Sequence, residues 1–256
     1  MLYMLENKTI LVVGAGGLLG SNLVSALLGQ GASVIAADIN RQAMLSRLEK
    51  VSGFDASGNL TLVELDLNDA QAVKAFFKGA KGLDGAANCA YPRNKHYGAK
   101  LFDVELEHFN ENVSLHLGAT FLFMQQCAAY FQREQQAFSL VNISSVYGVI
   151  APRFEIYENT AMTMPVEYAA IKAGVLQLSK YLTAYVSNSL FRSNCVSPGG
   201  IFDNQPQPFL EKYKSYCMGK GMLDISDVTG TVLFLLSESA KYVNGQNIIV
   251  DDGFSL

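Results

Sequence analysis

The amino-acid sequence predicts an α/β fold, in which one doubly wound parallel sheet of about seven strands is flanked by helices. Three observations support this prediction. Short, continuous apolar runs alternate with segments whose apolar residues recur at helical spacing. A glycine-rich turn follows the first apolar run, and an acid, Asp38, ends the second. Half of the residues are hydrophobic and only 16% are charged, so the chain can bury a large core.

The expected strands and helices alternate along the whole chain, which indicates a single domain over residues 1–256. Strands are expected at residues 8–13, 33–37, 60–65, 83–89, 138–143, 191–196 and 247–250. Helices are expected at residues 18–28, 41–51, 69–78, 104–136, 163–187 and 226–236. The fourth of these helices has a potential break near Gly118, and Pro165 falls in the first turn of the fifth. Residues 205–223 contain Pro206 and Pro208 and are expected to be irregular.

The turn after the first strand contains Gly14, Gly17 and Gly20 in a Gly-x-x-Gly-x-x-Gly pattern. Glycines let the backbone turn tightly and approach a pyrophosphate, and the following helix offers free N–H groups and the positive end of its dipole. An acid at the end of the second strand, here Asp38, can bind ribose hydroxyls. This placement predicts dinucleotide binding; the alternative is a structural turn without a ligand.

Charge and cysteine usage argue against several other classes of function. A net charge of -4 offers no basic field for nucleic acid. The four cysteines, at positions 89, 127, 195 and 217, are scattered, as expected for reduced thiols of a cytoplasmic protein. The histidines do not cluster with them, so no metal site is expected. Residues 9–37 carry no charge, but their glycines and their change from strand to helix spacing argue against a membrane span or signal peptide.

Tyr168 and Lys172 are spaced so that a helix would place both side chains on one face. A phenol beside an ammonium is a proton-handling pair, because the positive charge favours the phenolate and lowers the tyrosine pKa. Taken alone, this spacing equally fits a helix with one amphipathic tyrosine and one solvated lysine. The pair gains significance from the rest of the sequence.

The sequence contains a series of short motifs and resembles the short-chain dehydrogenase/reductase family over nearly its whole length. The motifs follow the family's order: the turn at residues 14–20, Asp66-Leu67, Asn88-Cys89-Ala90, Asn112, Ser144-Ser145, Tyr168-x-x-x-Lys172, Pro198-Gly199-Gly200, Asn244-Gly245-Gln246 and Val250-Asp251-Asp252-Gly253. The resemblance implies a Rossmann-type fold and hydride transfer between NAD(P) and a hydroxyl or carbonyl carbon.

The resemblance implies a catalytic tetrad of Ser145, Tyr168, Lys172 and Asn112. Tyr168 would carry the proton, and Lys172 would lower the Tyr168 pKa and hold the nicotinamide ribose. Ser145 would orient the substrate oxygen, and Asn112 would hold a water leading to Lys172. Ser145 is preferred to Ser144 because the second serine of this pair points to the site in the family. The plain alternatives are a strand-end turn residue for Ser145 and a cap of the helix break for Asn112.

The resemblance also implies a set of cofactor contacts besides Tyr168 and Lys172: Gly14, Gly17, Leu18, Leu19, Gly20, Asp38, Asp66, Leu67, Asn88, Ala90, Pro198, Gly199 and Ile201. Asp66 fits an N-cap of the next helix about as well as an adenine contact. In the family, Asn88 supports the sheet more than it touches the ligand. The Asp38 carboxylate favours NAD because it repels a 2′-phosphate, and nearby Arg41 leaves NADP open.

Several residues depart from the family pattern near the expected substrate site. Val13 replaces a threonine, Tyr91 stands where the family has glycine, and Phe202 follows Ile201 where a threonine is usual. The stretch from Ser145 to Tyr168 is longer than in the commonest members. These departures predict a substrate pocket of unusual shape.

Residues 91–100, 149–167 and 202–223 follow strand ends and are expected to wall the substrate site. The candidate substrate contacts are Tyr91, Arg93, Ser145 and Phe202. The first segment, which also carries Lys95, His96 and Lys100, is either a phosphate clamp or a solvated basic loop. Residues 91–95, 154–168 and 199–203 resemble a bacterial subgroup associated with sugar biosynthesis for surface polysaccharide or flagellin glycans. That likeness implies a sugar phosphate, a nucleotide sugar or a related hydroxy or oxo sugar as the substrate.

Two other functions stay open. A 3-oxoacyl-thioester or simple ketone reductase would prefer NADPH, against which Asp38 speaks. A non-catalytic NAD-binding sensor or scaffold would bind the dinucleotide without turnover. Family members are commonly dimers or tetramers joined through the two long helices, so the resemblance implies a homodimer or homotetramer.

Overall fold

The computed structural model describes residues 4–51 and 58–256. Its centre is one sheet of seven parallel strands in the order β3-β2-β1-β4-β5-β6-β7. The strands are β1 (Thr9–Val13), β2 (Ser33–Asp38), β3 (Leu60–Glu64), β4 (Gly85–Asn88), β5 (Phe138–Ile143), β6 (Phe191–Pro198) and β7 (Asn247–Val250). The predicted doubly wound fold is therefore confirmed.

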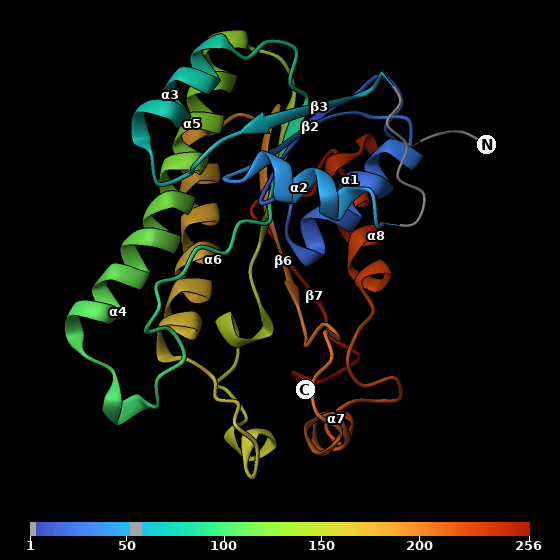
Figure 1. The fold of residues 1–256 in the computed structure, drawn as a ribbon. Helices are drawn as coiled ribbons and strands as arrows, with labels where there is room; N and C mark the ends of the chain where they lie inside the picture. The colour runs from blue at the N-terminus through green and yellow to red at the C-terminus, as the bar shows by residue number, and fades with distance from the viewer. Residues whose placement is uncertain (1–3, 52–57) are drawn as a thin grey trace.

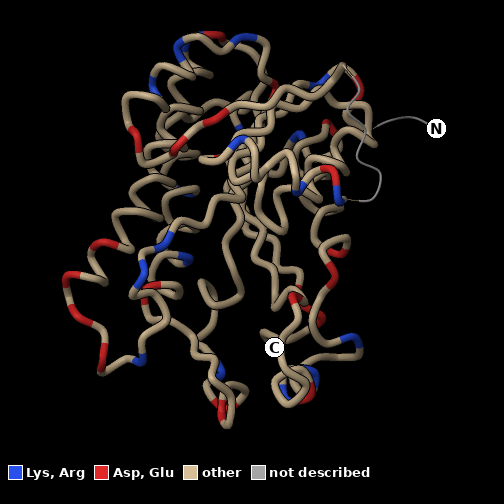
Figure 2. Tube along the Cα trace, in the orientation of Figure 1, with Lys and Arg blue, Asp and Glu red and all other residues tan. Residues whose placement is uncertain are grey.

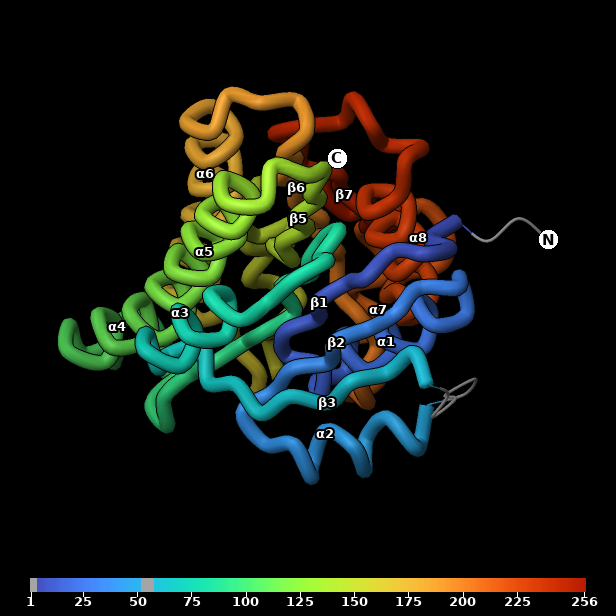
Figure 3. The backbone as a smooth tube through the Cα atoms, turned by 90° about the horizontal axis from the view of Figure 1, so that it is seen from above, coloured from blue at the N-terminus to red at the C-terminus, as the bar shows by residue number. Residues whose placement is uncertain are grey.

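Helices cover both faces of the sheet (Figure 1). The helices are α1 (Leu18–Gly29), α2 (Arg41–Leu48), α3 (Ala70–Gly79), α4 (Leu106–Asn112), α5 (Ala119–Glu134), α6 (Val166–Val186), α7 (Gln207–Lys214) and α8 (Ile225–Leu236). One buried apolar layer packs α3, α5 and α6 on one face of the sheet, and a second packs α1, α2 and α8 on the other. Seen from above, the same two groups of helices lie on opposite sides of the strands (Figure 3).

The strand order reverses between β1 and β4, because the chain moves outward to β2 and β3 and then returns to the other side of β1. In open parallel sheets, ligands bind in the crevice outside the carboxyl ends of the strands at this reversal. The chain segments that follow β1, β4, β5 and β6 all lie at this edge. The topology therefore brings the glycine turn and Ser145 to one end of the sheet.

The helix expected at residues 104–136 is not continuous. Helix α4 ends at Asn112, a π-helical turn spans Val113–Gly118, and α5 continues to Glu134. The predicted break near Gly118 is thus a change of helical pitch that begins directly after Asn112. Such π turns occur mostly inside α-helices and often at functional sites.

Two other expected elements differ from the structure. Helix α6 begins at Val166 rather than at residue 163, because Pro165 has an extended ψ of 137° and occupies the N-cap position. Residues 205–223 are not irregular throughout, since α7 forms with Pro206 as its N-cap and Pro208 in its first turn. Proline is tolerated in a first turn, where its missing N–H has no intrahelical partner.

Helix α7 belongs to a third, smaller apolar cluster beyond the carboxyl ends of the strands. Its Phe209 and Tyr213 are one helical turn apart and both buried. The Tyr213 ring stacks on Phe254, near the end of the chain, at 4.2 Å between ring centres. Arg153 lies over the Phe254 ring and donates a hydrogen bond to the Phe254 carbonyl oxygen. The chain terminus thereby fixes two of the segments expected to wall the substrate site.

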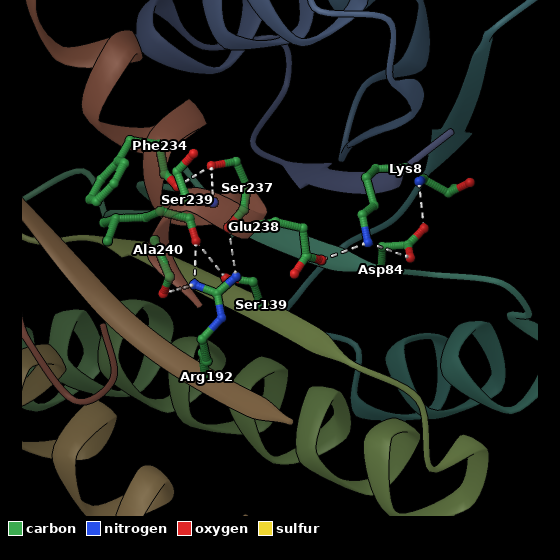
Figure 4. A network of polar contacts seen from close by, with 11 residues as sticks. Lys8, Asp84, Ser139, Arg192, Phe234, Ser237, Glu238, Ser239 and Ala240 are labelled. Atoms are coloured by element: carbon green, nitrogen blue, oxygen red, sulfur yellow. Dashed lines mark hydrogen bonds and ion pairs between the residues drawn. The ribbon is translucent and has the colours of Figure 1, made fainter. Parts of the chain in front are cut away.

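The opposite end of the sheet is held by a polar network (Figure 4). The buried Arg192 guanidinium donates hydrogen bonds of 2.7, 3.0 and 3.1 Å to the carbonyl oxygens of Leu235, Ala240 and Ser237. These carbonyls lie at and after the end of α8, where the last helical turn lacks internal partners. Nearby, Lys8 pairs with Asp84 at 3.6 Å and with Glu238 at 3.0 Å.

Acidic and basic residues are interspersed along the outer elements, and α4 with the segment before it is mostly acidic (Figure 2). No helix in the described residues combines the length and apolar character needed to cross a bilayer. Within the same residues, no group of three or more His, Cys, Asp or Glu side chains is arranged to hold a metal ion.

Candidate active site

Two hollows meet at the carboxyl edge of the sheet. A groove of about 350 Å³ runs from the glycine turn past Asp38 to Asp66 and Leu67. A deeper cavity of about 400 Å³ contains Ser145, Tyr168 and Lys172. Gly17, Cys89, Ala90 and Tyr91 line both hollows. A ligand could therefore extend without a break from the groove into the cavity.

The glycine turn is shaped by close backbone approach. Gly14 has a φ of +72°, and a Cβ built on it would lie 2.6 Å from the Ala90 nitrogen. A Cβ on Gly20 would overlap with the Gly14 carbonyl oxygen. Helix α1 begins within this turn, at Leu18, and its first helical turn contains no acidic residue. Its free N–H groups and positive dipole end can therefore accept an anionic ligand such as a pyrophosphate.

The two predicted acids of the groove have defined partners. The Asp38 carboxylate accepts a 2.8 Å hydrogen bond from the Gly16 N–H, so it is turned toward the glycine turn. Asp66 accepts a 2.8 Å hydrogen bond from the Asn68 N–H and lines the groove. The N-cap of α3 is Asp69, whose side chain accepts from the N–H groups of residues 71 and 72. Asp66 is thus not the cap of that helix. Of the two interpretations of Asp66, the cap is excluded and a ligand contact in the groove remains.

Tyr168 and Lys172 lie one turn apart near the start of α6, as their spacing predicted. Lys172 is buried, and its ammonium donates a 2.9 Å hydrogen bond to the Ile143 carbonyl oxygen at the end of β5. The ammonium nitrogen lies 5.7 Å from the centre of the Tyr168 ring. Ser144 and Ser145 separate in role: Ser144 donates a 2.8 Å hydrogen bond to the Lys172 carbonyl oxygen, whereas Ser145 hydrogen-bonds the Tyr168 side chain.

Burial dominates the electrostatics of this group. It raises the pKa of Tyr168 to about 12, and the hydrogen bond from Ser145 acts in the opposite direction. It also lowers the pKa of Lys172 to about 8. The resemblance assigned the lowering of the Tyr168 pKa to Lys172. In the structure, the group that lowers it is Ser145, because its hydroxyl contacts the phenol directly.

Asn112 is buried and does not line the cavity. Its side-chain oxygen accepts a 2.9 Å hydrogen bond from the Asn94 N–H, and its amide donates at 3.2 Å to Glu167. Glu167 is completely buried, and its second carboxylate oxygen has no protein partner. The Asn112 side chain therefore ties the segment 91–100 to the start of α6. It is not the cap of a helix break, since the chain continues into a π turn with helical backbone angles.

The remaining predicted residues divide into two groups. Leu18, Leu19, Pro198, Gly199 and Ile201 line the cavity. Asn88 accepts from the Ala90 N–H and donates toward Thr120, and it lines neither hollow. Arg93 and Phe202 also lie outside both linings, whereas Tyr91 is part of each.

Aromatic and methionine side chains form a further wall of the cavity: Tyr147, Tyr157, Met162, Met164, Phe209, Tyr213 and Met222. All but Tyr147 fall within the expected substrate segments. Tyr147 follows Ser145 by two positions, and that proximity was the signal that could have identified it. Lys172 is the only Lys, Arg, Asp or Glu among the described residues of this lining.

Comparison with known proteins adds three findings. A family model described as enoyl-(acyl carrier protein) reductase matches residues 14–255. "Post-translational flagellin modification protein A" of Campylobacter coli is 39% identical over 99% of this chain and 100% of its own length. A 7alpha-hydroxysteroid dehydrogenase of Bacteroides fragilis is 26% identical over 98% of this chain and 95% of its own.

Among solved structures, a short-chain dehydrogenase from Leptospira borgpetersenii serovar Hardjo-bovis, determined with bound NAD+, is similar to this fold. The TM-score is 0.86 at 31% identity, covering 99% of this chain and 94% of that one. The likeness therefore extends over the sheet, the helices and the segments around the cavity.

Proposed function

The chain belongs to the short-chain dehydrogenase/reductase family, whose members are oxidoreductases, and from this premise we propose that it exchanges a hydride between NAD and a hydroxyl-bearing carbon of a sugar derivative. The observation that carries the proposal is the joint cavity and groove, which places Ser145, Tyr168 and Lys172 at one end and Asp38 at the other.

The residues present fit a nicotinamide dinucleotide. Gly14 and Gly20 have no room for a side chain against the neighbouring backbone, which lets the turn bring the start of α1 to the groove, and Asp38 is turned to the same turn. Asp66 and Leu67, which line the groove, would contact the adenine end, and Pro198, Gly199 and Ile201, which line the cavity, would contact the nicotinamide end. NAD is favoured over NADP because the Asp38 carboxylate would repel a 2′-phosphate. When bound, the nicotinamide supplies the acceptor or donor of the hydride.

The side chains of the cavity handle the proton. Oxidation of a CH–OH group removes a hydride from carbon and a proton from oxygen, so the oxygen needs a base. Tyr168 takes this proton, or returns it during reduction. Ser145 hydrogen-bonds the same oxygen and stabilises the ionised Tyr168. Lys172, one helical turn away on α6, would hold the nicotinamide ribose.

A sugar ring suits the aromatic and methionine wall of the cavity. The tyrosine rings offer apolar faces with hydroxyl tips, and the Tyr157 hydroxyl donates to that of Tyr147 at 3.4 Å. The lack of a second charge in the described lining fits an uncharged ring better than a phosphate. The name of the Campylobacter coli relative, which refers to flagellin modification, further supports a sugar derivative.

A phosphate or nucleotide attached to the sugar would lie outside the cavity, near Arg93. The Arg93 guanidinium lies 5.3 Å from the centre of the Tyr91 ring at the mouth and makes no ion pair with the described residues. Acidic residues of the α4 region follow this segment, and Glu111 accepts a hydrogen bond from Asn94 within it. We therefore assign the anion contact to Arg93 alone and treat the rest of the segment as solvated.

The test is NAD reduction with a panel of sugar phosphates and nucleotide sugars. Tyr168→Phe should lower kcat by about 10²–10⁴-fold, because it removes the proton carrier. Tyr242→Phe, at an exposed tyrosine outside the groove and the cavity, is the control, and its kcat should be unchanged. Turnover of 3-oxoacyl thioesters with NADPH in place of sugars would favour the ketone-reductase alternative. Tight NAD binding without turnover on any alcohol or carbonyl would favour a sensor or scaffold.

We also propose that copies of the chain associate through α5 and α6. Phe121, Tyr181 and Tyr185 are 49%, 64% and 70% exposed on the outer face of these helices, which is unusual for clustered aromatic residues. The mass in solution, measured by light scattering, should correspond to a dimer or tetramer. Tyr181→Glu should reduce it, and a monomeric wild-type protein would contradict this proposal.

A further inference from the structure

Tyr91 lines both the groove and the cavity, in the segment that follows the end of β4 at Asn88. Its ring meets the Tyr168 ring edge to face, with 5.8 Å between centres and 87° between planes. The Lys172 ammonium nitrogen lies 5.5 Å from the centre of the Tyr91 ring. One side chain thus contacts both members of the proton-handling pair.

The Lys172 ammonium has few other sources of stabilisation. It is buried, and it donates a hydrogen bond to the Ile143 carbonyl oxygen. No carboxylate forms an ion pair with it in the described part of the chain. A buried ammonium without a counter-ion tends to lose its proton, because desolvation penalises the charged form.

The titratable groups that face Lys172 from the surrounding elements are neutral at physiological pH. Burial raises the pKa of Cys89, on the segment after β4, to about 12 and that of Cys195, on β6, to about 11. Burial also lowers the pKa of His116, in the π turn, to about 2. The two aromatic rings, Tyr91 and Tyr168, are therefore the groups placed to favour the positive charge.

We propose that Tyr91 is a positioning residue, which holds the Lys172 ammonium charged and in place by presenting the face of its ring. The negative face of an aromatic ring attracts a cation within about 6 Å, and the attraction grows when water is excluded. The Lys172 ammonium lies beside both the Tyr91 and Tyr168 rings, at 5.5 and 5.7 Å from their centres, so the two rings replace the counter-ion that the site lacks. The catalytic significance of this role rests on the proposed function, since Lys172 matters to the reaction only if Tyr168 carries the proton.

The Tyr91 ring is itself fixed from several sides. Its hydroxyl is 2.5 Å from that of Tyr97, and Arg93 lies over the ring at 5.3 Å from its centre. His116 meets the ring edge to face at 5.2 Å. Asn94, three positions on, is tied to Asn112. These contacts, most of them within the segment 91–100, therefore hold the Tyr91 ring in position.

The experiment is an NMR titration of the lysine side chains, with the Lys172 signal identified by its absence in Lys172→Arg. It needs neither substrate nor cofactor. Tyr91→Leu should lower the Lys172 titration midpoint by at least about half a pH unit, because the ring face is lost. Tyr91→Phe keeps the ring, loses the hydroxyl and should retain the wild-type midpoint. If the leucine variant does not fold, Tyr91→Met provides the same removal of the ring.

The direction in which the Lys172 titration midpoint moves distinguishes stabilisation of the ammonium by the Tyr91 ring from mere burial of Lys172. A side chain that only buried Lys172 would admit water when shortened, and the midpoint would rise toward the ordinary lysine pKa. A rise or no change in the leucine variant, or an equal fall in the phenylalanine variant, would overturn the proposal. NAD affinity of the wild-type protein, measured by calorimetry, is an independent readout. If the wild-type protein does not bind NAD, the proposed function is contradicted, but the expected change in the Lys172 midpoint on replacing Tyr91 stays the same.

Discussion

Replacing Gly20 by alanine tests whether the glycine turn depends on close backbone packing. Gly20 lies in the first turn of α1, where alanine alone would be favoured by about 1 kcal/mol. The new Cβ, however, would overlap with the Gly14 carbonyl oxygen and lie 2.9 Å from the Ala15 Cα. Both neighbours are backbone atoms, so no rotamer change relieves the overlap. Overpacking of this kind costs up to about 3 kcal/mol, and we expect a net loss of about 2 kcal/mol in the free energy of unfolding.

Urea unfolding measures this loss, and Gly230→Ala is the matched control. Gly230 lies inside α8 and has no atom within 4 Å of a built Cβ, so alanine there should stabilise the protein by about 1 kcal/mol. The displaced turn should also weaken NAD binding by at least about tenfold, which corresponds to about 1.4 kcal/mol. If Gly20→Ala stabilised the protein as much as Gly230→Ala and left NAD affinity unchanged, the packing argument would be wrong.

Three further predictions concern charge and hydrogen bonding. Asp38→Asn keeps a hydrogen-bond acceptor but removes the negative charge. The ratio of the NAD affinity to the NADP affinity, both measured by calorimetry, should therefore fall by about tenfold. An unchanged ratio would show that Asp38 does not determine the choice of cofactor. Arg192→Met should lower the free energy of unfolding, measured in urea, by about 3 kcal/mol because it removes three buried hydrogen bonds, and by more than Arg133→Met, whose guanidinium is more exposed. Burial lowers the pKa of His116 to about 2 in the folded state, whereas its pKa in the unfolded state is about 6.5. Between these two pH values the unfolded state therefore binds more protons than the folded state. Stability should therefore fall by about 1.4 kcal/mol per pH unit below pH 6.5, and His116→Phe should flatten this fall; equal slopes would contradict it.

The succession of strands could be predicted because it depends on local pattern. The central strands β1, β4, β5 and β6 are largely buried in the parallel sheet, and β1 appears in the sequence as a continuous apolar run, whereas the edge strands β3 and β7 are only partly buried. Where a boundary was wrong, tertiary hydrogen bonds decided it. The fourth strand begins at Gly85 rather than at residue 83, because the Leu83 N–H donates to the Tyr130 hydroxyl and the Asp84 N–H to the Thr9 carbonyl oxygen.

Helix α7 shows why the substrate wall was harder to predict. Its two prolines read as irregular structure, and its short length leaves little helical pattern. The helix is stabilised by Phe209 and Tyr213, which pack against residues distant in the sequence, including Phe254. Local helix propensity gives no indication of this partner, because the contact of Tyr213 with Phe254 forms only when distant parts of the chain have packed together.

The sequence by itself determined the sheet, the glycine turn and the family, since each depends on residue types at fixed local spacing. The Tyr168–Lys172 pair was visible as a spacing, but its electrostatic state was not. Burial sets both pKa values, and burial is a property of the whole fold. Only the tertiary structure brought the Tyr91 ring over Lys172 and tied Asn112 to Glu167, because these contacts join segments that the sheet and α6 carry to one place.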